Sequence, residues 1–139
     1  MAQTIREVMT KDPVCMPADK SVFDAARMMR DHDIGDVIAL ESERITGILT
    51  DRDIVVRSLA EGRDPKTTTI GEVASGDVTT VSPDDSFDDA VQLMRQRNIR
   101  RLPVVENGTP VGIVSLGDLA MERDRQSVLA DISSAPPNN

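Results

Sequence analysis

Gly112-Ile-Val-Ser-Leu-Gly-Asp118 repeats the pattern of Gly47-Ile-Leu-Thr-Asp-Arg-Asp53, and the two stretches lie 65 positions apart along the chain. Each has a glycine, two apolar residues, a hydroxyl residue, two variable residues and an aspartate. At the same offset the chain matches itself without a gap from residue 5 to residue 54. A chain that repeats itself in this way is built from two copies of one supersecondary unit.

Each copy has the same order of predicted elements around this stretch. Ser21 and Ser86 predict the starts of two helices, because each is an N-cap residue with an aspartate three positions later. Asn107-Gly108 predicts a tight hairpin turn, because both residues tolerate positive φ. An extended segment opens each copy, at 12–16 and 77–81. The predicted hairpin strands are 37–40 and 44–49 in copy one and 102–105 and 110–114 in copy two, and second helices begin near Asp51 and Gly117. Each copy therefore has the predicted order β-α-β-β-α.

The repeated stretch lies where a strand ends and a helix begins. Free backbone N–H groups at such a corner can bind an anion. Thr50 or Ser115 could donate to a phosphate or sugar oxygen, and Asp53 or Asp118, one helical turn further on, could accept from ribose hydroxyls. The glycine allows close approach of backbone or ligand. Taken alone, each corner is more simply a helix N-cap with a capping box.

The whole pattern resembles the CBS domain over residues 5–122, and the chain is similar to small stand-alone CBS-pair proteins of the hypoxic-response type. The motifs are Ile99-Arg-Arg-Leu-Pro-Val-Val105 with Gly112–Asp118 in copy two, and Val8-Met-Thr10, His32-Asp-Ile-Gly35 and Leu49-Thr-Asp-Arg-Asp-Ile54 in copy one. The resemblance implies an α/β fold with two CBS repeats packed as a pseudo-two-fold Bateman module, which commonly forms a homodimer. It places CBS domain 1 at 5–62, a linker at 63–69, CBS domain 2 at 70–124, and a C-terminal helix end with a flexible tail at 125–139.

The resemblance also implies a ligand. Modules of this family bind adenosine compounds in the cleft between the repeats, most often AMP, ADP or ATP and less often S-adenosylmethionine or NAD, and no cofactor is required. Asp53 and Asp118 would then hold ribose, with Thr50 and Ser115 beside ribose or phosphate. The residues that would line the adenine slot are Val14, Ile38, Val81 and Val104.

The two predicted sites are unequal in charge. Arg100 and Arg101 precede the second-copy strand and suit bidentate phosphate binding, although they are equally well explained as a solvated pair. The matching positions in copy one are Gly35 and Asp36, and only Arg52 could compensate there. The site at Asp118 is therefore the favoured one.

Composition excludes several classes of function. A net charge of −8 and the absence of Trp and Tyr make nucleic acid a poor partner. Cys15 is alone, no signal pattern precedes the repeats and no apolar run is long enough to span a membrane, so we expect a cytoplasmic protein. Cys15 and His32, each the only residue of its type, predict neither a metal site nor a nucleophilic pair.

The leading hypothesis is therefore a regulatory ligand-sensing module and not an enzyme. The alternative is a nucleotide-free homodimeric module that meets an unknown protein partner. A nucleotide hydrolase that uses Asp51 and Asp53 ranks last, because no nucleophile–base pair accompanies them.

Overall fold

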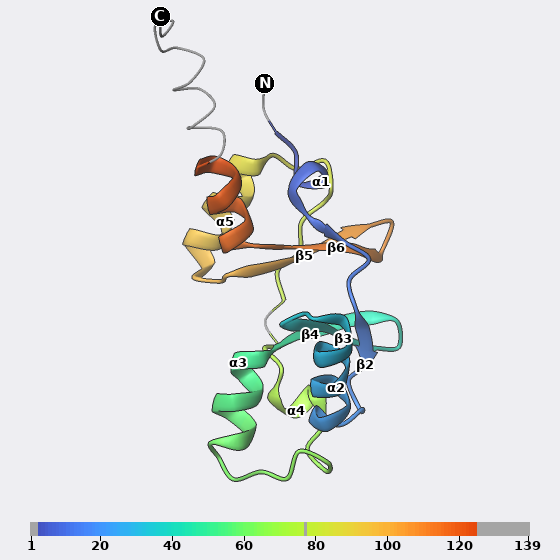
Figure 1. The fold of residues 1–139 in the computed structure, drawn as a ribbon. Coiled ribbons are helices and arrows are strands. Elements are labelled where there is room, and N and C mark those ends of the chain that lie inside the picture. The colour runs from blue at the N-terminus through green and yellow to red at the C-terminus, as the bar shows by residue number, and fades with distance from the viewer. Residues whose placement is uncertain (1–2, 77, 125–139) are drawn as a thin grey trace, which may run out of the picture. The chain divides into compact units, whose positions relative to one another are not determined.

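The computed structural model describes residues 3–76 and 78–124, and the chain divides into two compact units. Unit 1 comprises Met1–Lys11 together with Thr80–Asn139, and unit 2 comprises Asp12–Thr79. Each unit contains one three-stranded sheet with helices packed beside it (Figure 1). The predicted α/β class with two repeats is confirmed.

The sheet of unit 2 has the strand order β2-β3-β4, in which β2 and β3 are parallel and β3 and β4 are antiparallel. Its strands are β2 (Cys15–Pro17), β3 (Asp36–Glu41) and β4 (Arg44–Thr50). Its helices are α2 (Val22–His32), α3 (Asp51–Asp53), the π-helix η1 (Ile54–Leu59) and α4 (Ile70–Val73).

The sheet of unit 1 has the order β1-β6-β5, and its neighbouring strands are antiparallel. Its strands are β1 (Thr10–Lys11), β5 (Arg101–Glu106) and β6 (Thr109–Ser115). Its helices are α1 (Ile5–Val8) and α5 (Phe87–Arg97), and residues 116–124 are also helical.

The long helices begin at the predicted caps. Ser21 Oγ accepts a hydrogen bond from Asp24 N at 3.0 Å, and Ser86 Oγ accepts one from Asp89 N at 3.0 Å. Each helix then buries one stripe of apolar side chains against its sheet, because residues three or four positions apart share a helix face. The buried residues are Val22, Ala25 and Met29 on α2 and Phe87, Ala90, Val91 and Met94 on α5.

Both hairpins have two-residue turns with positive φ at both positions. Asn107 and Gly108 have φ values of 54° and 78°, and Ser42 and Glu43 have values of 50° and 66°. This backbone twist matches the right-handed twist of the flanking strands. The predicted hairpins are confirmed in both copies.

The two units do not coincide with the two sequence repeats, because the repeats exchange their leading helices. Ile5 N of α1 donates to Asp85 O at 3.0 Å, and the Ile5 side chain is fully buried in unit 1. In the same way Ile70 N of α4 donates to Lys20 O at 2.8 Å in unit 2. The blue N-terminal segment lies beside β6 in Figure 1. The predicted boundaries follow the duplication, whereas the compact units follow these contacts.

The predicted linker at 63–69 lies within unit 2 and contacts α2. Val22 N donates to Thr68 O at 2.9 Å, and Thr68 is buried. Gly62 has φ of 71° after the second helix of copy one, a conformation that glycine adopts without steric cost. The predicted tail at 125–139 lies outside the described residues.

Two features of the fold differ from the predicted elements. Among the described residues of the predicted segment 77–81, only Val81 pairs, in a single bridge with Val104. The second feature lies in copy one. Residues Ile54–Leu59 form a π-helix, in which Ala60 N donates to Val55 O five residues earlier. No sequence signal predicts this wide turn. Among the described residues, none of the helices is both long enough and apolar enough to cross a membrane.

Candidate functional site

The corner of unit 1 is formed where β6 ends at Ser115. Ser115 Oγ accepts a hydrogen bond from Asp118 N at 3.0 Å and so caps the helix of residues 116–124. Asp118 is exposed, and within residues 3–76 and 78–124 its carboxylate has no hydrogen-bond partner. The hydroxyl hydrogen of Ser115 and both carboxylate oxygens of Asp118 therefore remain available to a ligand.

Arg100 and Arg101 lie at the same corner of unit 1. Leu116 N donates to Arg100 O at 2.7 Å, and Arg101 is the register partner of Ser115 between β5 and β6. Arg100 is exposed and Arg101 is half-buried. The structure thus brings both predicted arginines close to the predicted hydroxyl.

The corner of unit 2 contains a complete capping box instead. Asp53 N donates to Thr50 Oγ1 at 3.1 Å, and Thr50 N donates to Asp53 Oδ2 at 3.0 Å. One carboxylate oxygen of Asp53 therefore accepts from local backbone, and only Oδ1 remains available to a ligand. The simpler interpretation of the motif, a helix cap, accounts for Asp53 better than for Asp118.

The corner of unit 2 also differs in charge from the corner of unit 1. Asp36 is the register partner of Thr50, and Asp51 N donates to Gly35 O at 2.9 Å. A Cβ on Gly35 would lie 3.0 Å from Asp51 Oδ2, so the Asp51 carboxylate packs against this glycine. Arg52 is exposed. Two carboxylates beside the corner disfavour a phosphate.

The glycine of each repeated stretch makes room for an exchanged segment. A Cβ on Gly47 would lie 2.7 Å from Ser75 O, and a Cβ on Gly112 would lie 2.5 Å from Met9 Sδ and 2.9 Å from Thr10 O. Of the two roles that the sequence left open, close approach of backbone explains both glycines without a ligand.

The four residues predicted to line an adenine slot lie as two neighbouring pairs, one in each unit. Val81 and Val104 form a parallel bridge and are buried in the core of unit 1. In unit 2 Ile38 N donates to Val14 O at 2.9 Å, with Ile38 fully buried and Val14 half-buried. Their contact with adenine stays a prediction.

Cys15 and His32 do not provide a reactive pair. Cys15 Sγ contacts Pro13 O at 3.8 Å, and burial raises the pKa of its thiol, whereas a nucleophilic cysteine needs a lowered pKa. His32 is exposed at the end of α2. Across the described part of the chain, no three His, Cys, Asp or Glu side chains are grouped so that they could hold a metal ion.

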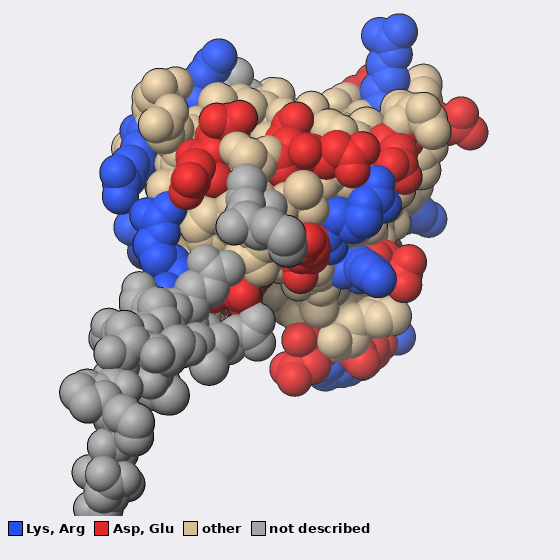
Figure 2. All heavy atoms as spheres, turned by 90° about the horizontal axis from the view of Figure 1, so that it is seen from above, with Lys and Arg blue, Asp and Glu red and all other residues tan. Residues whose placement is uncertain are grey.

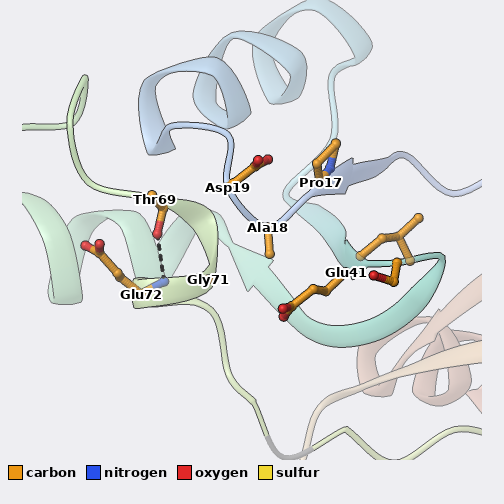
Figure 3. Close-up of a pocket in the computed structure, with 9 residues that line it drawn as sticks. Pro17, Ala18, Asp19, Glu41, Thr69, Gly71 and Glu72 are labelled. Atoms are coloured by element: carbon orange, nitrogen blue, oxygen red, sulfur yellow. Dashed lines mark hydrogen bonds between the residues drawn. The ribbon is translucent and has the colours of Figure 1, made fainter.

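Unit 2 also contains a cavity of about 550 Å³ that sequence reasoning missed. It lies at the far end of the sheet from Thr50, because β3 runs from Asp36, the register partner of Thr50, to Glu41 at the cavity. The lining residues are Pro17, Ala18, Asp19, Leu40, Glu41, Ser42, Thr69, Gly71 and Glu72 (Figure 3).

Acidic and basic side chains are interspersed over the surface shown in Figure 2, so this face presents no continuous basic patch. A nucleic-acid backbone would need such a patch. This face therefore gives no support to a nucleic-acid partner.

The duplicated fold and its two corners define a CBS pair, a class of regulatory module. The CBS domain model matches residues 5–59 and 70–124, and the chain therefore belongs to the CBS domain family.

Two relatives and one solved structure illustrate the similarity. The CBS domain-containing protein YhcV of Bacillus subtilis is 39% identical over 120 residues, which cover 86% of this chain and 85% of that protein. Hypoxic response protein 1 of Mycobacterium tuberculosis is 35% identical over 127 residues, covering 91% of this chain and 89% of that protein. A crystal structure of Hypoxic Response Protein I with two coordinated zinc ions has a TM-score of 0.72 at 36% identity, covering 86% of this chain and 98% of that chain.

A CBS domain pair that was solved with bound ligands is also similar to this chain. The pair of protein MJ0100, in complex with 5′-methylthioadenosine and S-adenosyl-L-methionine, has a TM-score of 0.80 at 25% identity. The match covers 91% of this chain and 99% of that chain.

Proposed function

We propose that this CBS pair is a ligand sensor that binds an adenosine-containing nucleotide, AMP, ADP or ATP, at the corner formed by Ser115 and Asp118. The observation that supports this choice is the exposed carboxylate of Asp118, which has no hydrogen-bond partner among the described residues, whereas Asp53 Oδ2 already accepts from Thr50 N. The complex of the MJ0100 pair with two adenosine compounds supports an adenosine ligand.

The corner offers a group for each part of a nucleotide. The Asp118 carboxylate can accept from both ribose hydroxyls, and a charged hydrogen bond of this kind is stronger than a neutral one. Arg100 and Arg101 can pair with phosphate oxygens in a bidentate manner. The backbone N–H groups at the start of the helix of residues 116–124 add to the attraction for an anion.

Binding would regulate through a difference in affinity between two states of the module, because a ligand shifts an equilibrium only by that difference. We infer no turnover of the nucleotide. A hydrolase that uses Asp51 would need an activated nucleophile, and the Asp51 carboxylate instead accepts from Arg52 N at 2.7 Å.

A thermal-shift panel of AMP, ADP, ATP, NAD and S-adenosylmethionine tests the proposal, followed by calorimetric titration with the best ligand. A ligand at a hundred times its dissociation constant adds about 2.7 kcal/mol to the free energy of unfolding. We expect Asp118→Ala to weaken binding about ten- to a hundred-fold. The matched control is Asp53→Ala, which should lower stability by about 1 kcal/mol and leave the affinity unchanged. A panel in which no compound raises the melting temperature would refute the proposal.

A second candidate function is a nucleotide-free homodimeric interaction module, and exposed apolar residues favour it. Val55, Val56 and Leu59 on η1 are 55%, 45% and 69% exposed. A soluble domain rarely exposes such neighbouring apolar side chains without a partner. Sedimentation velocity tests this candidate, since Leu59→Glu should convert a dimer to a monomer. A monomeric parent protein at micromolar concentration would contradict it.

A further inference from the structure

In unit 1 an arginine from α1 joins two carboxylates. The Arg6 guanidinium nitrogen Nη2 lies 2.8 Å from Glu106 Oε2 and 3.4 Å from Asp84 Oδ1. Glu106 ends β5, and Asp84 precedes α5. The hydrogen bond to Glu106 raises the pKa of Arg6, as expected for a cation held by an anion.

The same two carboxylates recur in unit 2 without the arginine. At the repeat offset Glu41 corresponds to Glu106, Asp19 to Asp84, and Gly71 to Arg6. The backbone is equivalent at this position, because Arg6 N donates to Pro83 O at 2.8 Å and Gly71 N donates to Ala18 O at 2.9 Å. The cavity of unit 2 is lined by Asp19, Glu41 and Gly71, so it opens at the position equivalent to the guanidinium site of unit 1.

Two of the cavity's three carboxylates are unpaired in the part of the chain that the structure describes. Glu72 accepts from Arg63 Nη2 at 2.6 Å, whereas Asp19 and Glu41 have no ion pair among residues 3–76 and 78–124. Figure 3 shows the three acidic residues on three separate segments around the cavity. Both Asp19 and Glu41 are exposed, so a ligand from solution can reach them.

We propose that this cavity of unit 2 binds a guanidinium group supplied by a ligand. The group would lie at the position equivalent to that of the Arg6 guanidinium in unit 1. A guanidinium group can donate from its planar N–H groups to more than one carboxylate, as Arg6 does with Glu106 and Asp84 in unit 1. A volume of about 550 Å³ is within the usual range for small-molecule sites, and Pro17, Ala18 and Leu40 offer apolar contacts for an aliphatic stem. The site is independent of the nucleotide corner at Asp118.

Calorimetric titration with L-arginine and with L-citrulline tests the proposal on the full chain, because citrulline has nearly the same shape and an uncharged urea group. We expect arginine to bind at least about ten-fold more tightly. Glu41→Gln and Asp19→Asn should each weaken arginine binding about ten-fold. Equal binding of arginine and citrulline, or binding of neither, would overturn the proposal.

Substitutions at Gly71 and at its equivalent, Arg6, provide the most discriminating variants. Gly71→Arg should fill the cavity and abolish arginine binding, and the control Gly71→Ala should retain it, because its Cβ would lie 3.3 Å from Ala18 O without reaching the carboxylates. Arg6→Gly should open a second site and raise the stoichiometry from one to two. Circular dichroism and the melting temperature check that each variant is folded. Arginine binding that survives in folded Gly71→Arg would contradict the assignment.

A capped Gly-Arg-Gly peptide distinguishes two sources of the guanidinium group, a small molecule and an arginine side chain of a protein partner. Tighter binding of free arginine identifies a small guanidinium compound, and tighter binding of the peptide identifies an arginine side chain of a protein partner. Both results support a guanidinium site, and a peptide with citrulline in place of arginine should fail to bind in either case.

Discussion

Gly112→Ala should dislodge the exchanged N-terminal segment from unit 1. A Cβ at this position would lie 2.9 Å from Thr10 O, and backbone cannot move away as a flexible side chain can. Thr10 pairs with Ile113 and Lys11 pairs with Gly112 in the β1–β6 ladder, so relief of the clash must separate these strands. Overpacking of this kind costs about 1–3 kcal/mol. With a urea m-value of about 1–3 kcal/mol per molar, the denaturation midpoint should fall by roughly 1 M.

Urea unfolding followed by circular dichroism measures this shift, and Gly117→Ala is the matched control. The nearest non-neighbouring atom to a Cβ on Gly117 is Ser115 Oγ at 3.8 Å, which is an ordinary contact. Because Gly117 lies in the helix of residues 116–124, alanine there should stabilise by about 0.5–1 kcal/mol. The two glycine-to-alanine changes should therefore act in opposite directions. An unchanged midpoint in Gly112→Ala would refute the account of the exchanged segment.

Three further predictions test local features. Ser86→Ala removes the hydroxyl that caps α5 and should lower the free energy of unfolding by about 1 kcal/mol in chemical denaturation, while Ser86→Asp should retain most of the stability. Leu102→Ala leaves a cavity beside α5, because Leu102 is fully buried, and should cost about 2–5 kcal/mol; a midpoint within error of the parent would contradict this core assignment. Cys15 should react with a thiol reagent more slowly in the folded protein than in denaturant at the same pH, because its raised pKa leaves less thiolate, and equal rates would exclude this burial effect.

Local elements were predictable because their signals lie within a few residues of each other. Ser21 and Ser86 begin the long helices through hydrogen bonds to backbone three residues later. Asn107-Gly108 forms the turn that its conformational freedom allows. The alignment of residue 5 with residue 70 also identified the duplication correctly, and the family match covers both copies.

The exchange of leading helices was not predictable, because a sequence pattern indicates which face of α1 is apolar and not which sheet covers it. Ile5 would satisfy the same pattern in either unit, and only its contacts assign it to unit 1. The roles of Gly47 and Gly112 depend on this exchange, so the sequence left backbone and ligand as open alternatives. The mismatch of Arg6 with Gly71 was visible in the alignment, but its meaning required the positions of Asp84 and Glu106.

The duplicated scaffold allows the two units to differ in charge while their backbones stay alike. Leu116 N donates to Arg100 O at 2.7 Å, and Asp51 N donates to Gly35 O at 2.9 Å at the equivalent position. Side chains at such positions can gain or lose charge at little cost to the fold, since backbone hydrogen bonds hold the corner in place. On this basis we propose an anionic ligand for the corner of unit 1 and a cationic ligand for the cavity of unit 2. If local charge alone decides which ligand binds, Arg6→Gly should create guanidinium binding in unit 1. The affinity for nucleotide should stay the same, because this substitution frees only the carboxylates of Glu106 and Asp84.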